Sequence, residues 1–301
     1  MYPTLFRKQP APAYQRQQVT TPDDDFLDID TLCQGRSRLA ILCHGLEGSS
    51  SSQYMMATAS ILHSNGWDVV CMNYRFCSGK INNSLRMYHS GATDDLDTIV
   101  EHYKQDYEEL ALVGFSLGGN LVLKYAGENA TDLDHRIQQV VAVSVPVDLL
   151  AGCINICKAS NFIYQQNFLK SLKAKVKLKK QQYPDRIDLG LLKKVRTVYD
   201  FDDHFTGPIH GFADALDYYT QCSSKQFLSA IDKRTMIINA LDDPFLPEEC
   251  YPYAEASANP NIQLLTPTYG GHVGFVLRGE RYFWIEKKIE AFLNKKSESH
   301  N

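Results

Sequence analysis

A short run, Gly-Phe-Ser-Leu-Gly at residues 114–118, constrains the fold of this chain more than any other feature. The apolar residues 110–113 precede it, and the helix-forming stretch 120–125 follows it. A strand, a sharp turn and a helix in this order expose the serine hydroxyl at the edge of a sheet. The glycines on both sides are needed because a Cβ there would collide with a neighbouring strand or helix. The run therefore predicts that Ser116 is a nucleophile.

The rest of the chain alternates short apolar runs with helical stretches. Because these runs are almost continuously apolar, they are typical of parallel strands buried on both faces. We expect an α/β fold with a mostly parallel central sheet and helices on both faces, as a single domain over 1–301. The expected strands are 39–43, 67–72, 110–113, 140–145, 234–239 and 262–266, and the expected helices include 54–65, 92–104 and 280–294.

The rhythm of strands breaks between about 147 and 210, where aromatic residues are frequent. An insertion after the strand that follows the serine helix predicts a helical cap over the pocket. Within it, Leu169, Leu172 and Val176 have helical spacing, and lysines fill much of Lys170–Lys180. Solvated lysines on a cap helix are the first interpretation. The alternative is a transient contact of this basic helix with an anionic membrane surface.

A serine nucleophile needs a histidine to take its proton and an acid to orient that histidine. In folds of this kind the acid follows the serine, and the histidine comes last. Asp243 follows a predicted strand within Asp-Pro-Phe-Leu-Pro, and we select it as the acid, with its neighbour Asp242 as the alternative. His272 lies between glycines after the last predicted strand, and we select it as the base.

An acyl-transfer site also needs N–H donors for the oxyanion of the tetrahedral intermediate. The residue after the nucleophile, Leu117, supplies one candidate N–H. The loop Cys43–Ser49 follows an early strand, and Leu46 is the second candidate, with Gly45 allowing the chain to turn close to the substrate. We expect His44 to brace this loop.

Bulk composition excludes several other classes of protein. The net charge of −4 provides no basic field for nucleic acid, and no window approaches 18 uninterrupted apolar residues. The first residues lack the apolar segment of a signal peptide, and the eight cysteines are spread through predicted core elements, as reduced thiols are. We expect a cytoplasmic protein that uses neither a metal nor a cofactor. The oligomeric state is left open.

Taken together, the motifs resemble the YheT-like branch of the α/β-hydrolase superfamily, whose relatives include yeast medium-chain ester synthase/esterases and mammalian phospholipase-type hydrolases. The resemblance spans roughly residues 15–295. It rests on colinear segments at 44–49, 88–96, 114–120, 211–219, 239–245 and 270–275. It implies a triad of Ser116, Asp243 and His272, a cap, and small-molecule esters of fatty acids as substrates. An acyltransferase that uses the same acyl-enzyme is the alternative activity, and a non-catalytic scaffold is a further one.

The chain departs from this family in one loop. The family usually has Arg-Gly-Cys-Ser-Gly-Glu-Pro-Asn where residues 75–82 read Arg-Phe-Cys-Ser-Gly-Lys-Ile-Asn. Phe76 thus replaces a glycine and Lys80 a glutamate near the expected pocket mouth, so substrate preference is not transferred. The family motif Tyr-His-Ser-Gly at 88–91 receives no chemical role from the sequence.

Overall fold

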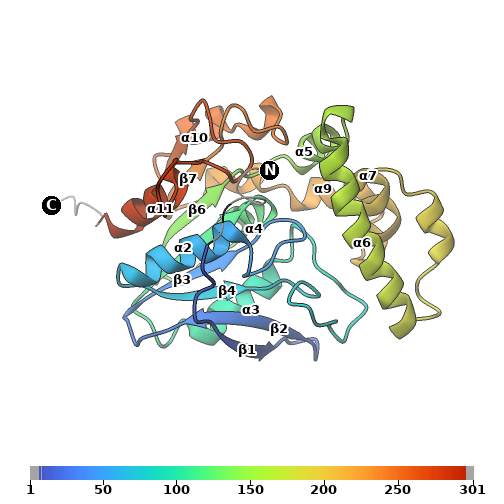
Figure 1. Cartoon of the computed structure of the whole chain (residues 1–301), viewed down its shortest axis with the longest axis horizontal. Coiled ribbons are helices and arrows are strands. Elements are labelled where there is room, and N and C mark those ends of the chain that lie inside the picture. The colour runs from blue at the N-terminus through green and yellow to red at the C-terminus, as the bar shows by residue number, and fades with distance from the viewer. Residues whose placement is uncertain (1–6, 8, 296–301) are drawn as a thin grey trace.

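The computed structural model describes Arg7 and residues 9–295, which form an eight-stranded sheet of order β1-β2-β4-β3-β5-β6-β7-β8 (Figure 1). The strands from β3 to β8 run parallel to one another. At one edge of the sheet, β2 pairs antiparallel with β4, and β1 pairs antiparallel with β2. The bounds are β1 Gln15–Thr20, β2 Phe26–Leu32, β3 Arg38–Cys43, β4 Asp68–Met72, β5 Glu109–Phe115, β6 Ile137–Val143, β7 Arg234–Ile238 and β8 Ile262–Leu265. The predicted α/β class and its mostly parallel sheet are confirmed.

The two antiparallel strands were not predicted. Strand β2 alternates apolar and acidic residues, and its Asp28 and Asp30 are buried rather than solvated. Asp30 accepts two hydrogen bonds from Arg16 of β1, at 2.7 and 2.8 Å. Because a neighbouring strand supplies hydrogen bonds to these acidic side chains, the strand can be buried without being an apolar run. A prediction based on apolar runs therefore misses it.

Helices cover both faces of the sheet. One apolar layer contains side chains of α2 (Gln53–Ser64) and α11 (Trp284–Asn294), and the other contains those of α3 (Thr93–Tyr103) and α4 (Leu117–Glu128). Helix α11 begins four residues later than predicted. The short helix α10 (Tyr253–Ala258) connects β7 to β8. None of the described helices is long and apolar enough to cross a membrane.

A helical insert separates β6 from β7 and lies beside the sheet (Figure 1). It contains α5 Leu149–Ile156, α6 Phe162–Gln182, α7 Val198–Phe201, a π-helical turn Asp202–Thr206, α8 Gly207–Ile209 and α9 Ala215–Cys222. The insert has its own buried apolar cluster, built from side chains such as Leu169, Val176 and Phe201. The predicted cap at about 147–210 overlaps this segment.

Candidate active site

Ser116 occupies the tight turn between β5 and α4. Its backbone has φ 53° and ψ −117°, a conformation that a non-glycine residue keeps only when its surroundings impose it. A Cβ on Gly114 would lie 2.0 Å from the carbonyl oxygen of Gly118, and one on Gly118 would lie 2.4 Å from that of Cys43. The two glycines are therefore required by backbone contact, as the sequence predicted.

The structure brings His272 and Asp243 to this serine from distant parts of the chain. His272 Nε2 lies 2.9 Å from Ser116 Oγ. His272 Nδ1 lies 2.9 and 3.1 Å from the two carboxylate oxygens of Asp243. The Asp243 side chain is fully buried, and the ring of Phe245 packs 4.5 Å from the imidazole. A hydroxyl, an imidazole and a carboxylate in this order can transfer a proton away from the hydroxyl.

The neighbouring aspartate has a different place. Asp242 accepts the backbone N–H groups of Gly270 and Gly271, at 2.8 and 2.7 Å. It therefore holds the loop that carries His272, whereas Asp243 contacts the imidazole itself. The geometry thus favours Asp243 over Asp242 for the role of the acid.

The two expected oxyanion donors line one pocket together with Ser116. In the loop after β3, the N–H of Gly45 donates to Tyr54 and that of Glu47 donates to Tyr88, both at 2.9 Å. The N–H of Leu46, between them, makes no hydrogen bond to any described residue. Leu117 is the first residue of α4, where a backbone N–H has no partner within the helix. Neither N–H group has a hydrogen-bond partner among the described residues, so both stay candidates for binding the oxyanion.

His44 braces the loop, as predicted. The ring is fully buried; its Nδ1 donates to the carbonyl of Gly45 at 2.7 Å, and its Nε2 accepts the N–H of Tyr74 at 3.2 Å. Burial lowers the pKa of His44 to about 3, so the ring is neutral and takes no proton at ordinary pH.

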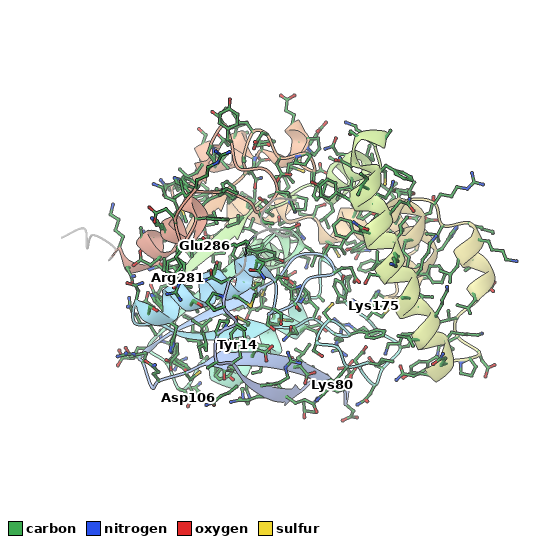
Figure 2. All side chains as sticks on the ribbon, in the orientation of Figure 1. Tyr14, Lys80, Asp106, Lys175, Arg281 and Glu286 are labelled. Carbon is green, nitrogen blue, oxygen red and sulfur yellow. The ribbon has the colours of Figure 1, made fainter. Side chains whose placement is uncertain are left out.

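Glu47, whose role the sequence did not reveal, connects this loop to the insert. Its carboxylate accepts hydrogen bonds from Tyr88 Oη at 2.6 Å and from Lys175 Nζ of α6 at 2.7 Å, and Ser171 donates to its second oxygen. Figure 2 shows Lys175 on the side of α6 that faces the sheet. The only available signal for this bridge was the Tyr-His-Ser-Gly motif, since Tyr88 is its first residue.

The lysines at 170–180 are mostly engaged with the protein. Lys179 is fully buried and donates to the carbonyls of Asn82 and Ser84, both at 2.6 Å. Lys173 and Lys180 donate to carbonyls within the insert, at Val195 and Ile187. Of the six lysines, only Lys170 and Lys177 are exposed. The helix therefore differs from both expectations, since most of its lysines are neither solvated nor free to form a basic surface.

The pocket beside Ser116 has a volume of about 100 Å³ and runs between the sheet and the insert. Most of its wall is apolar, with Leu149, Ile156, Leu172 and Val198 from the insert. His89 and Ser90, from the loop before α3, and Asp202, from the insert, add polar groups to the lining. Among the described residues, no cluster of three or more His, Cys, Asp or Glu side chains could hold a metal ion.

Comparison with known proteins agrees with this geometry. The family model described as alpha/beta hydrolase fold matches residues 40–278. The chain is 36% identical to an Escherichia coli (strain K12) protein named "Putative esterase YheT", over 97% of this chain and 88% of that protein. It is 25% identical to phospholipase ABHD3 of Homo sapiens, over 89% of this chain and 68% of that one. Among solved structures, the esterase Pf2001 of Pyrococcus furiosus has a TM-score of 0.60 at 17% identity, over 93% of this chain and 89% of that one.

Proposed function

The chain belongs to the α/β hydrolase fold family, and we propose that it is a serine esterase that cleaves carboxylic esters of fatty acyl groups through an acyl-enzyme on Ser116. The observation that carries this proposal is the continuous chain of contacts from Ser116 Oγ through His272 to the buried Asp243. Names of similar proteins, which include an esterase and a phospholipase, support ester substrates.

The proposed reaction begins when Ser116 Oγ attacks the ester carbonyl and His272 Nε2 takes its proton. Asp243 keeps the hydrogen on Nδ1 and stabilises the imidazolium that forms. The N–H groups of Leu46 and Leu117 donate to the oxyanion of the tetrahedral intermediate. His272 then gives its proton to the leaving alcohol, and water repeats the sequence on the acyl-enzyme.

The substrate class follows from the wall of the pocket. Apolar side chains of the insert surround the space next to Ser116, and such a wall accepts an alkyl chain rather than a charged peptide. A cytoplasmic location stays a prediction from the sequence. Transient membrane contact through Lys170–Lys180 also stays a prediction, one that depends on the two exposed lysines.

Replacement of the nucleophile tests the proposal. Wild type should hydrolyse a short p-nitrophenyl ester and be labelled by a fluorophosphonate probe, and Ser116→Ala should lose both properties. By analogy with other triad enzymes, we expect kcat to fall on the order of 10⁶-fold. Circular dichroism and thermal melting should show an unchanged fold. Undiminished turnover by Ser116→Ala would contradict the assignment, and a rise in product ester upon addition of an alcohol would identify acyl transfer.

A further inference from the structure

A carboxyl group stands in the wall of the pocket without a cationic partner. Asp202 lines the same pocket as Ser116. Thr206 Oγ1 donates to one of its oxygens at 2.5 Å, and the Tyr219 hydroxyl donates to the other at 2.6 Å. Within the described part of the chain, no lysine, arginine or histidine forms an ion pair with it. Each oxygen keeps a second lone pair that can accept a hydrogen bond.

A carboxyl group in a mostly apolar pocket costs free energy of desolvation unless a ligand forms a hydrogen bond with it. Asp202 is partly buried and has no counter-charge, which disfavours its ionised form: desolvation raises the pKa of Asp202 to about 6. A hydrophobic side chain here would make the pocket a better receptor for a plain alkyl chain. The carboxyl instead offers acceptor positions inside a pocket that is otherwise mostly apolar.

The local backbone is also unusual. Asp202 is the first residue and Thr206 the last of a π-helical turn between α7 and α8. Both side chains line the pocket, and Thr206 contacts Asp202 through the hydrogen bond described above. Turns of this kind are rare in proteins and are frequent at functional sites.

A second polar group lines the same pocket. His89 Nδ1 accepts the N–H of Gly91 at 3.2 Å, so the hydrogen of the neutral ring is on Nε2. That N–H donates to no described residue, and the ring lines the pocket. Its ring lies 5.8 Å from the ring of Tyr218, which is next to Tyr219, the partner of Asp202. The pocket thus presents a hydrogen-bond donor at His89 and hydrogen-bond acceptors at Asp202, and the adjacent residues Tyr218 and Tyr219 contact these two groups.

We propose that Asp202, assisted by His89, makes the pocket select esters whose bound chain carries a hydrogen-bond donor, such as a hydroxyl group, over esters with plain alkyl chains of equal length. A hydroxyl group on the bound chain can donate to the Asp202 carboxyl, and a substrate oxygen beside His89 can accept the N–H of that ring. A plain chain leaves the remaining acceptor positions of Asp202 and the N–H of His89 without a partner, which lowers its affinity. Asp202 is then a specificity-determining residue, and this role rests on the proposed esterase function.

Two matched substrate series test the proposal. The first compares p-nitrophenyl hexanoate with p-nitrophenyl 6-hydroxyhexanoate, and the second compares the hexanoate esters of an alkanol and of the diol of equal length. In wild type, kcat/KM should favour the hydroxylated member of one series by about tenfold or more. The series that shows the preference identifies whether the acyl or the alcohol part enters the pocket.

The preference should disappear or reverse in Asp202→Leu and weaken in Asp202→Asn, while kcat/KM for the plain ester should increase in Asp202→Leu. Asp203→Leu, which changes the adjacent aspartate outside the pocket wall, is the matched control. Hydrolysis of plain and hydroxylated esters with equal kcat/KM in wild type would overturn this inference and leave the esterase function intact. Absence of any ester cleavage by wild type would overturn the esterase function itself. If Asp202→Leu fails to fold, the wild-type ratio and Asp202→Asn decide the matter.

Discussion

The reacting groups and the far wall of the pocket are held in place in different ways. Main-chain groups of the turn and the loop set the position of the first: Ser116 N–H donates to Val143 O at 2.8 Å, and the N–H groups of Gly270 and Gly271 donate to the Asp242 carboxylate. Side-chain contacts connect the insert to the sheet, as in the bond from Lys175 to Glu47. The comparison teaches that substitutions can alter the pocket wall without moving the nucleophile, so selectivity can change separately from the chemistry.

The largest effect should come from the backbone-held region. Asp243→Asn should lower kcat by about 10⁴-fold because the amide cannot keep the hydrogen on Nδ1 of His272. Asp242→Asn should cost much less, since an amide oxygen can still accept the N–H groups of Gly270 and Gly271. Steady-state kinetics on a p-nitrophenyl ester measures both variants. The opposite ranking would show that the imidazole is oriented by Asp242.

An intermediate effect should come from the bridge between the two regions. Glu47→Gln leaves Lys175 largely buried without its counter-charge, and we expect the free energy of unfolding to fall by about 2–3 kcal/mol. Lys175→Met should cost a similar amount, and the double variant less than the sum. Urea denaturation of all four proteins measures the coupling, with Lys177→Met as an exposed control. Additive losses would show that the bridge contributes no interaction energy of its own.

The smallest effect concerns pH and the attachment of the insert. His210 Nε2 accepts the N–H of Met87 at 3.2 Å, its Nδ1 donates to Thr206 O at 2.7 Å, and burial lowers the pKa of His210 to about 4. An unfolded histidine has a pKa of about 6.5, so the unfolded state binds more protons between these values. The contribution of His210 to stability is therefore complete above pH 6.5 and is lost as the pH falls toward 4.

This loss should amount to about 1–2 kcal/mol between pH 7 and pH 5. His210→Gln, which cannot take up the proton, should be less stable at pH 7 but should show a flatter pH dependence. Denaturation curves at both pH values measure the difference, with the exposed His135→Gln as control. Identical slopes for wild type and His210→Gln would show that the ring titrates normally in the folded protein.

The difference between the reacting groups and the pocket wall also explains how much could be predicted from sequence. The turn around Ser116 depends on residues next to one another, and the glycines that it requires are visible in the printed chain. Its long-range partners could be selected because the order of serine, acid and histidine is a property of the fold. The choice between Asp242 and Asp243 needed coordinates, since both follow the same strand.

The pocket wall could not be predicted in this way. The segment 198–204 contains three aspartates, and nothing in the order of residues distinguishes Asp202 from Asp200 or Asp203. Asp200 caps α7, accepting the N–H of Thr197, whereas Asp202, the first residue of the π-helical turn, lines the pocket. Likewise, the lysines of α6 look solvated in sequence because their carbonyl partners lie in other loops.

Phe76 couples the loop at 75–82 to α6. Its φ of 65° lies in the left-handed region, which usually belongs to glycine and costs another residue on the order of 1–2 kcal/mol. Its buried ring lies 5.7 Å from each of the ammonium groups of Lys175 and Lys179. We therefore expect epistasis among the three positions: a glycine at position 76 would relax the loop but remove the ring against which two cations pack, so its effect on stability should depend on whether Lys175 and Lys179 are present.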